Sequence, residues 1–191
     1  MSLVKLRSPF IFYCDVPNHE EIKDIYYDKL LDILDERRDE CHKDAWNCKV
    51  LTTHGFNIEI LWEPLFLKSV VWEPLDQMLN EVDLNIYPTQ SKIGGVWANY
   101  YEEGFFQETH DHVGPPGSSI FSGIYILDQK GGNKTSFINN NFGILDKRVH
   151  TKDLDDIKEG TVILFPSNLL HYVNPVDTDR CTISFNIQCE F

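Results

Sequence analysis

The sequence predicts an α+β fold in which N-terminal helices precede a β-sandwich or jelly roll. Two observations support it: apolar residues recur at helical spacing early in the chain, and beyond Gly94 short segments rich in Val, Ile, Phe and Tyr are punctuated by Gly, Pro and Asn. Helices followed by a run of strands are typical of this class. With 191 residues, 42% of them hydrophobic, we expect one compact domain over 1–191.

Two helices are expected in the N-terminal part, at about residues 1–90. The first runs from Asn18 to about Arg38, where Asn18 with Glu21 three residues later resembles a capping box. The second begins near Pro74, because proline is tolerated in the first turn of a helix. One apolar stripe follows it, formed by Leu75, Met78, Leu79 and Val82.

The jelly-roll core is expected at about residues 94–191. Its short apolar segments predict strands at about 95–101, 105–110, 119–127, 135–138, 161–165, 170–173 and 180–189. Gly131-Gly132-Asn133 is expected to form a turn, and Asn139 to Leu154 a longer loop. Long loops are often functional, so this loop and Val113 to Ser119 are candidate entrance elements, or simple surface connections.

Composition argues against several function classes. The net charge of -13, with 30 acidic against 17 basic residues, disfavours a nucleic-acid partner, because such binding needs a basic patch. Five cysteines, an odd number without C-x-x-C spacing, fit neither a disulfide framework nor a cysteine-rich zinc site, and we expect buried free thiols. No apolar run reaches the roughly 18 residues of a membrane span. We expect a soluble cytoplasmic protein with no membrane partner.

Three histidines form a candidate metal site. Residues i and i+2 of an extended segment point to one face, so His110 and His112 can bind one ion while Asp111 points away. His171 follows a strand that ends at Pro166, and a jelly roll can place such a strand beside an earlier one. Three protein ligands leave open positions on a metal, as catalysis requires. The alternative is that these are surface or hydrogen-bonded core histidines.

An arginine follows the third histidine nine residues later. Arg180, Thr182 and Ser184 share one face of the last strand by alternation, and a guanidinium fork suits a carboxylate. The alternative is a surface ion pair with Asp177 or Asp179.

Asn99 and Tyr101 also share a face, and their amide and phenol could hydrogen-bond an anionic ligand, although a strand tyrosine is more often core packing. The remaining histidines and the tryptophans are interpreted as surface, structural or packing residues: His19, His42, His54, His150, Trp46, Trp62, Trp72 and Trp97.

Three blocks within about 95–191 resemble the 2-oxoglutarate and Fe(II)-dependent oxygenases, specifically their prolyl-hydroxylase-like branch. The chain is most similar to uncharacterised oxygenases of bacterial and phage type with an H-x-H iron motif. The blocks are Asn99-x-Tyr101-x-x-Gly104 with His110 nine residues after the tyrosine, Ser122 to Leu127 in place of a Y-Y-L strand, and His171 with Arg180 nine residues later.

The resemblance implies a double-stranded β-helix with flanking N-terminal helices. It implies that His110, His112 and His171 hold Fe(II), and that Arg180 binds the distal carboxylate of 2-oxoglutarate. Thr182 and Tyr101 would assist, with Asn99 nearer the metal. The reaction implied is hydroxylation of an unidentified small-molecule or peptide substrate, with release of succinate and carbon dioxide.

Two positions depart from the family pattern. His112 occupies the place of the usual carboxylate ligand, so three neutral imidazoles would leave the ferrous ion its full double charge. Asp111 could replace it only if the turn is irregular. Ile126 stands where the second tyrosine of the Y-Y-L strand is expected. Two alternatives are therefore kept: a cupin-like three-histidine metalloprotein that does not use 2-oxoglutarate, and a non-catalytic β-sandwich that serves as an interaction protein.

Overall fold

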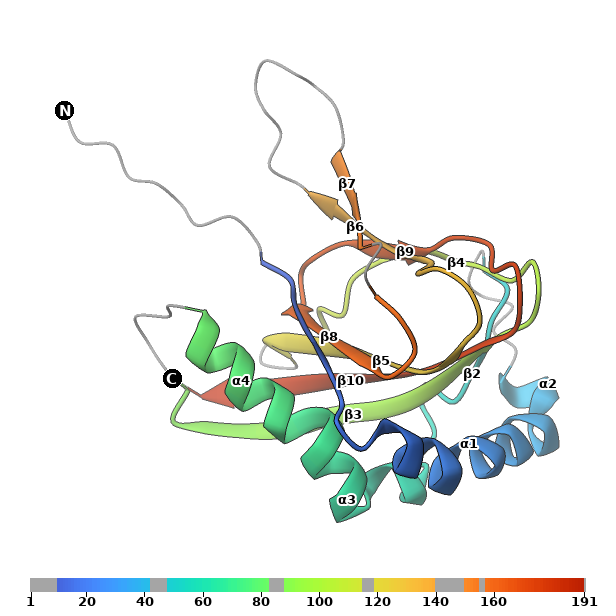
Figure 1. Cartoon of the computed structure of the whole chain (residues 1–191), viewed down its shortest axis with the longest axis horizontal. Coiled ribbons are helices and arrows are strands. Elements are labelled where there is room, and N and C mark those ends of the chain that lie inside the picture. Colours follow the sequence, from blue (N-terminus) through green and yellow to red (C-terminus); the bar gives the residue numbers. More distant parts are fainter. Residues whose placement is uncertain are drawn as a thin grey trace.

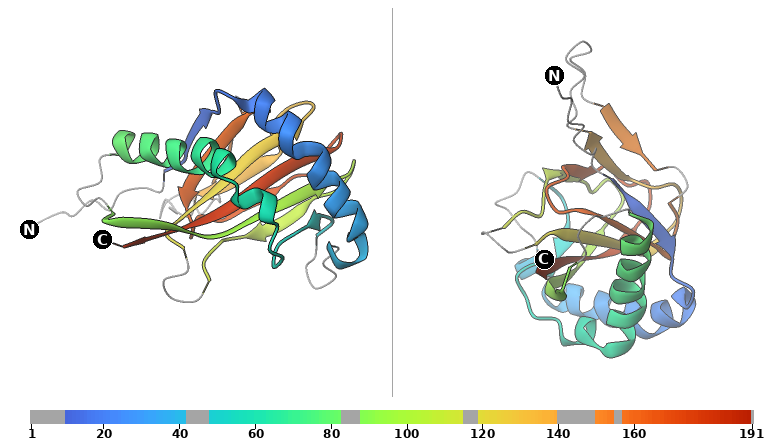
Figure 2. Two further views of the ribbon diagram at one scale, coloured as in Figure 1. Left: turned by 90° about the horizontal axis from the view of Figure 1, so that it is seen from below. Right: turned by 90° about the vertical axis from the view of Figure 1, so that its left-hand side faces the viewer.

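The computed structural model describes residues 10–41, 48–82, 88–114, 119–139, 150–154 and 157–190. It confirms the predicted fold class: two antiparallel sheets face each other as a double-stranded β-helix, and helices cover one side (Figure 1). Figure 2 shows from two further directions that the helices lie against the six-stranded sheet and not against the four-stranded one.

The two sheets are wholly antiparallel. The six-stranded sheet has the order β1 (Phe12–Asp15), β8 (Thr161–Pro166), β5 (Phe121–Gln129), β10 (Arg180–Glu190), β3 (Gln90–Tyr101) and β2 (Leu51–Thr52). The four-stranded sheet has the order β4 (Gln107–His110), β9 (His171–Val173), β6 (Thr135–Asn139) and β7 (His150–Asp153).

All seven predicted strands are present, and the described residues contain three others that were not predicted. β1 and β2 come from the N-terminal part, which is therefore not purely helical, and they form the two edges of the larger sheet. β7 lies inside the stretch that was expected to be a loop, while residues 140–149 of that stretch are outside the described residues. At the predicted turn Gly131 has a φ of 97°, a conformation that glycine adopts without strain.

The first helix, α1 (His19–Glu36), lies where the apolar spacing predicted it, followed by the short α2 (Arg38–Cys41). The prediction of a capping box is wrong, because its hydrogen bonds are not formed. The Asn18 side chain caps no backbone N–H; its Nδ2 instead donates to Glu21 Oε2 at 3.3 Å.

The second helix begins earlier than expected. A 3-10 turn, η1 (Glu59–Trp62), leads into α3 (Pro64–Phe66), a π-helical segment η2 (Leu67–Trp72) and then α4 (Glu73–Glu81). Pro74 therefore lies in the first turn of α4, as predicted, but directly behind an existing helical segment. A proline removes a backbone donor, and a wide π turn is one way for a helix to continue past that gap.

The core lies on both faces of the six-stranded sheet. Tyr125 and Leu127 of β5 pack with α1, α3 and α4, whereas Ile124 and Ile126, on the alternate face, pack between the two sheets. Every residue of β5 is buried. This strand is therefore covered on both sides, and the space between the sheets is available for a site.

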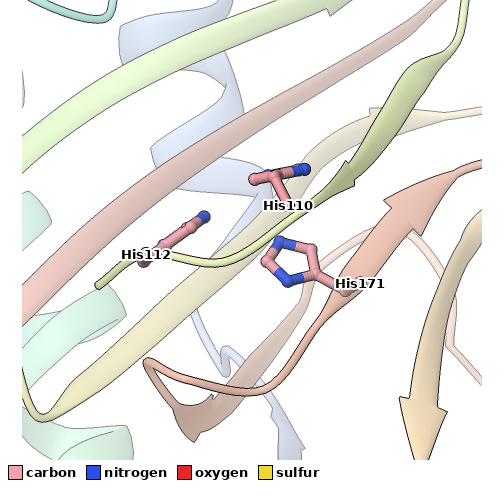
Figure 3. Close-up of side chains that lie close together, drawn as sticks. All are labelled: His110, His112 and His171. Carbon is pink, nitrogen blue, oxygen red and sulfur yellow. The ribbon is translucent and has the colours of Figure 1, made fainter. Parts of the chain in front are cut away.

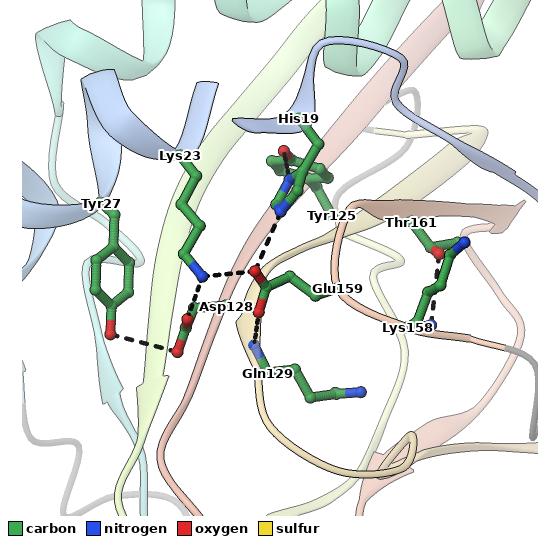
Figure 4. Close-up of polar contacts among 9 residues, drawn as sticks. All are labelled: His19, Lys23, Tyr27, Tyr125, Asp128, Gln129, Lys158, Glu159 and Thr161. Atoms are coloured by element: carbon green, nitrogen blue, oxygen red, sulfur yellow. Dashed lines mark hydrogen bonds and ion pairs between the residues drawn. The ribbon is translucent and has the colours of Figure 1, made fainter. Parts of the chain in front are cut away.

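A polar network ties α1 to the larger sheet (Figure 4). Lys23 Nζ donates to Asp128 Oδ1 and Glu159 Oε1, both at 2.5 Å. The two nitrogens of His19 contact the Tyr125 hydroxyl at 2.7 Å and Glu159 Oε1 at 3.3 Å. His19 therefore has the structural role expected of it.

Two expectations from composition can be compared with the described residues. None of their helices is both long and apolar enough to cross a bilayer. Cys14, Cys48, Cys181 and Cys189 are free thiols, but only Cys181 is fully buried; the other three are half-buried.

Candidate active site

The three predicted histidines come together at the edge of the four-stranded sheet (Figure 3). The pairing of β4 with β9 sets His110 directly opposite His171. His112 lies two residues beyond β4, where its backbone N–H donates to the Ser167 carbonyl at 2.9 Å. The ring centroid of His110 lies 4.3 Å from the ring centroid of His171 and 5.5 Å from that of His112. One nitrogen from each ring lies within 4.8 Å of the others, close enough for one metal ion.

Each ring is held through its Nδ1 atom. His110 Nδ1 lies 2.8 Å from the Glu108 carbonyl oxygen, and His171 Nδ1 lies 3.1 Å from the Leu169 carbonyl oxygen. His112 Nδ1 lies 3.0 Å from Asn186 Oδ1. Because an oxygen acceptor keeps the ring proton on Nδ1, the lone pair is on Nε2 in all three rings. This is the tautomer in which Nε2 can bind a metal.

The three imidazoles are neutral at neutral pH. Burial, together with a smaller effect of the neighbouring His110, lowers the pKa of His112 to about 3. Burial also lowers the pKa of His110, and lowers the pKa of His171 well below its ordinary value. A metal needs the neutral form of histidine as its ligand, so burial prepares the rings for coordination.

Asp111 is placed differently from its two neighbours. Its side chain is exposed, and its Oδ1 accepts a hydrogen bond from the Val113 backbone N–H at 3.1 Å. It is not a member of the histidine cluster. Of the two residues considered for the third position, the structure therefore brings His112, not Asp111, to the other two rings.

A cavity of about 400 Å³ joins the histidines to Arg180. All seven residues singled out from the sequence line it: Asn99, Tyr101, His110, His112, His171, Arg180 and Thr182. β3 and β10 form one wall, and β4 and β9 contribute to the other. The alternating face of β10 runs from Arg180 to Asn186, which contacts His112, so the cavity has an arginine end and a histidine end.

Arg180 is fully buried, and the described residues offer it no charged partner. Its Nη2 donates to Thr135 Oγ1 at 2.8 Å, while Nε and Nη1 have no hydrogen-bond partner among the residues that the structure describes. Within the described part of the chain, no carboxylate forms an ion pair with it. Burial lowers its pKa to about 10, so the guanidinium remains charged at neutral pH. Two buried, charged donors without an acceptor are costly unless a ligand supplies one.

The alternative of a surface ion pair for Arg180 is wrong. Asp177 contacts Lys134 Nζ at 2.5 Å, and Asp179 accepts a hydrogen bond from the Tyr100 hydroxyl at 2.8 Å. Both aspartates are thus engaged elsewhere, and Arg180 points into the cavity instead.

The other predicted residues are held by the protein. Asn99 Oδ1 accepts from the Thr52 hydroxyl at 2.8 Å, and Asn99 Nδ2 donates to Ser184 Oγ at 3.1 Å. The Tyr101 hydroxyl donates to Gln107 Oε1 at 2.7 Å. These contacts fix the side chains that form the wall of the cavity.

Several lining residues were not predicted. Trp97 lies two residues before Asn99 on the same face of β3, and Asn186 lies two residues after Ser184 on the same face of β10. Extending the alternation by one step on each strand would have predicted both. His54 was interpreted as a surface or structural residue; it is exposed but borders the cavity, with its ring 4.9 Å from Trp97. Gln107 and Thr135 carry no sequence signal of their own.

Other predictions have mixed outcomes. Ile126 packs between the sheets, and Tyr125, at the first tyrosine position of the Y-Y-L strand, faces the helices. Val113 and Gly114 border the cavity, whereas residues 115–118 of that candidate entrance lie outside the described residues. The same is true of His42 and Trp46, and of the His150 side chain.

The residues present fit both a metal and an organic anion. Three neutral imidazoles that converge through Nε2 suit a divalent first-row transition metal. The two unpartnered guanidinium donors suit a carboxylate. A double-stranded β-helix with these two groups in one cavity defines the class of protein: a jelly-roll protein with a candidate metal centre.

Residues 95–186 match the family described as "Putative 2OG-Fe(II) oxygenase". This matched part of the chain contains all seven residues that the sequence analysis singled out as candidate ligands. No curated protein sequence matches the chain.

Solved structures share the fold at low sequence identity. HygX from Streptomyces hygroscopicus, with nickel, 2-oxoglutarate and hygromycin B bound, has a TM-score of 0.61 and 11% identity over 95% of this chain and 83% of that chain. The viral collagen prolyl hydroxylase vCPH from Paramecium bursaria Chlorella virus-1, in its 2OG complex, has a TM-score of 0.55 and 15% identity over 95% of this chain and 97% of that chain. A Trichoplax adhaerens prolyl hydroxylase, in complex with a peptide fragment, has a TM-score of 0.58 and 12% identity over 94% of this chain and 83% of that chain.

Proposed function

We propose that this protein is an Fe(II)- and 2-oxoglutarate-dependent oxygenase that hydroxylates a small-molecule or peptide substrate and releases succinate and carbon dioxide. The observation that carries the proposal is the buried Arg180 guanidinium, whose Nε and Nη1 donors lack a partner, in the same cavity as the three histidines. A histidine cluster or a buried arginine alone is compatible with several functions, whereas the two groups together match a metal and a bound dicarboxylate.

The three histidines would hold Fe(II) through Nε2, because their Nδ1 atoms are engaged with protein oxygens. Bound iron and 2-oxoglutarate supply the activation of dioxygen and the oxidation of the substrate. The protein's own part is to place these groups and to exclude water from them.

Arg180 would bind the distal carboxylate of 2-oxoglutarate through Nε and Nη1, while Thr135 keeps the guanidinium oriented through Nη2. Thr182 and Tyr101 line the same end of the cavity and would assist. Asn99 pairs with Thr182 across the β3–β10 ladder, one step closer to the histidines. That position agrees with its proposed place nearer the metal.

The substrate would approach from the side opposite Arg180, where the cavity is bordered by exposed residues such as His54, Asp111 and Val113. Structures that share the fold hold hygromycin B in one case and a peptide fragment in another. Both a small molecule and a peptide therefore remain within the proposal.

Anaerobic titration of the protein with Fe(II) and 2-oxoglutarate tests the proposal. Chelation of iron by the keto acid produces a charge-transfer absorption band, and admission of oxygen should then release succinate even without substrate. Arg180→Ala should retain the metal but lose the band at moderate 2-oxoglutarate concentrations. If the wild-type protein binds metal but yields neither band nor succinate, the oxygenase assignment is wrong.

One observation favours a second candidate, a three-histidine metalloprotein that does not use 2-oxoglutarate: His112 stands in place of the usual carboxylate. A set of three imidazoles suits several divalent metals. In that case Arg180→Ala would leave all metal-dependent chemistry intact. Absence of metal binding by the wild-type protein would instead support a non-catalytic interaction protein.

A further inference from the structure

His112 is held differently from the other two histidines. His110 and His171 each contact the backbone carbonyl of the residue two positions earlier, an acceptor that every sequence provides. His112 contacts a side chain, Asn186 Oδ1, which comes from the distant strand β10. The ring at the unusual ligand position thus depends on one specific residue type elsewhere in the chain.

Asn186 is itself held in a fixed orientation. Its Oδ1 accepts a second hydrogen bond, at 2.8 Å, from Ser122 Oγ on β5, where Ser122 is its cross-strand partner. Ser122 Oγ lies 2.8 Å from Ser167 Oγ, and the Ser167 carbonyl accepts the His112 backbone N–H at 2.9 Å. Both serines are buried. Together these hydrogen bonds form a closed circuit that starts at the His112 side chain and returns to the His112 backbone N–H.

The orientation of the Asn186 amide decides which nitrogen of His112 carries the proton. With Oδ1 towards the ring, Nδ1 is protonated and the Nε2 lone pair faces the other two histidines. With the amide reversed, Nδ2 would donate to Nδ1, and the proton would be on Nε2, where it would block a metal. In this structure Oδ1 faces the ring and also accepts from the Ser122 hydroxyl, which corresponds to the first orientation.

We propose that Asn186 is the positioning residue that makes His112 a neutral Nε2 ligand at the place where the superfamily usually has a carboxylate. The inference rests on the proposed metal site. A neutral amide also keeps this position uncharged, whereas an aspartate at 186 would add a negative charge next to the ring. The hydrogen bonds that join Ser167 to Ser122 and Ser122 to Asn186 help to hold the amide in its orientation.

The test is Co(II) binding to the metal-free full-length protein, followed by the visible absorption of the cobalt ion. Asn186→Leu removes the acceptor at nearly constant size and should weaken binding about 10- to 100-fold, the usual effect of losing such a partner. Asn186→Asp keeps the acceptor and should bind Co(II) at least as tightly as wild type. Gln188→Leu, two residues further along β10, is outside the cavity lining and should leave the affinity unchanged.

The outcomes separate the inference from the proposed function. If wild-type protein does not bind Co(II), the metal site itself is wrong. If wild type binds and Asn186→Leu binds equally well with the same spectrum, only the role of Asn186 is overturned. Should Asn186→Leu fold poorly, Ser122→Ala gives the same decision: it removes the donor that orients the amide, and a Co(II) affinity equal to wild type would refute the role.

Discussion

Arg180 is the direct cross-strand neighbour of Tyr101, and its guanidinium carbon lies 5.7 Å from the centroid of the Tyr101 ring. The electron-rich face of an aromatic ring attracts a cation, more strongly where water is excluded. The Tyr101 hydroxyl is directed to Gln107, so the ring and not the hydroxyl contacts the charge. This contact and one bond to Thr135 are how the fold tolerates a buried arginine without a carboxylate.

The first prediction concerns Arg180→Met. Loss of a buried charged partner typically costs about 2–5 kcal/mol of binding free energy, so 2-oxoglutarate affinity should fall roughly 30- to 4,000-fold. Isothermal titration with the Co(II)-loaded protein measures it, and Co(II) affinity itself should not change.

The same variant should not destabilise the ligand-free protein. Replacing a buried unpaired charge by an apolar side chain of similar volume is often neutral or stabilising. We therefore expect a Tm equal to or above wild type without 2-oxoglutarate, and no further rise when it is added. A large loss of Tm in the ligand-free variant would mean that Arg180 is structural.

The second prediction compares adjacent residues. His112→Gln should weaken Co(II) binding by more than about 100-fold, since losing even an outer partner of a ligand costs about 10- to 100-fold. Asp111→Asn should leave the affinity within about 3-fold, because an amide oxygen can still accept the Val113 N–H and the carboxylate is outside the cluster. The reverse pattern would make Asp111 the third ligand.

Much of the candidate site could be predicted because it follows from alternation along single strands. Arg180 and Thr182 share a face whatever the strand pairs with, and so do Asn99 and Tyr101. That the two pairs line one cavity follows from the β3–β10 register, which sets Arg180 opposite Tyr101 and Thr182 opposite Asn99. The sequence alone does not give that register; the family resemblance implied only that the four residues bind one ligand.

Features that depend on contacts between strands could not be predicted. Thr135 reaches Arg180 from the other sheet, and Asn186 reaches His112 across 74 positions of sequence. β1 and β2 are too short, at four and two residues, to show a periodic pattern, and their places at the sheet edges come from pairing with β8 and β3.

The third prediction concerns acid stability. Burial alone would raise the pKa of Glu159, but hydrogen bonds from the Gln129 backbone N–H, Lys23 and His19 outweigh it and hold the pKa below its ordinary value of 4.5. A carboxylate whose pKa is lowered in the folded state stabilises the protein at pH values above its ordinary pKa. That contribution is lost as the pH falls through the lowered pKa. The free energy of unfolding should therefore decrease from pH 6 towards pH 3.

Glu159→Gln removes this pH dependence together with the ion pair to Lys23. We expect a loss of about 1–3 kcal/mol at pH 7, typical of hydrogen bonds to a charged group, and a smaller difference from wild type at pH 3. Urea denaturation at both pH values measures it. Glu81→Gln, an exposed carboxylate at the end of α4, serves as the control and should track wild type. An equal deficit at both pH values would show that the Glu159 charge contributes nothing.

The fourth prediction concerns Gly123, in the strand that replaces Y-Y-L. Gly123 faces Phe185 across the β5–β10 pair, and a Cβ atom there would lie 2.1 to 2.7 Å from the Phe185 ring. Phe185 is fully buried in the core cluster, so any shift of its ring would disturb its other core contacts. Gly123→Ala should therefore cost about 1–3 kcal/mol of stability, as overpacking of a core does.

The Gly123 effect should be specific to the clash. Gly132→Ala places a methyl group where no atom lies within 4 Å, so its unfolding free energy should stay within about 0.5 kcal/mol of wild type, as for an ordinary surface change. Adding Phe185→Leu to Gly123→Ala removes the ring atoms that meet the new methyl group, so the double variant should be more stable than the sum of the two single losses. Strict additivity in urea denaturation would show that Gly123 is needed for its backbone and not for the space it leaves to Phe185.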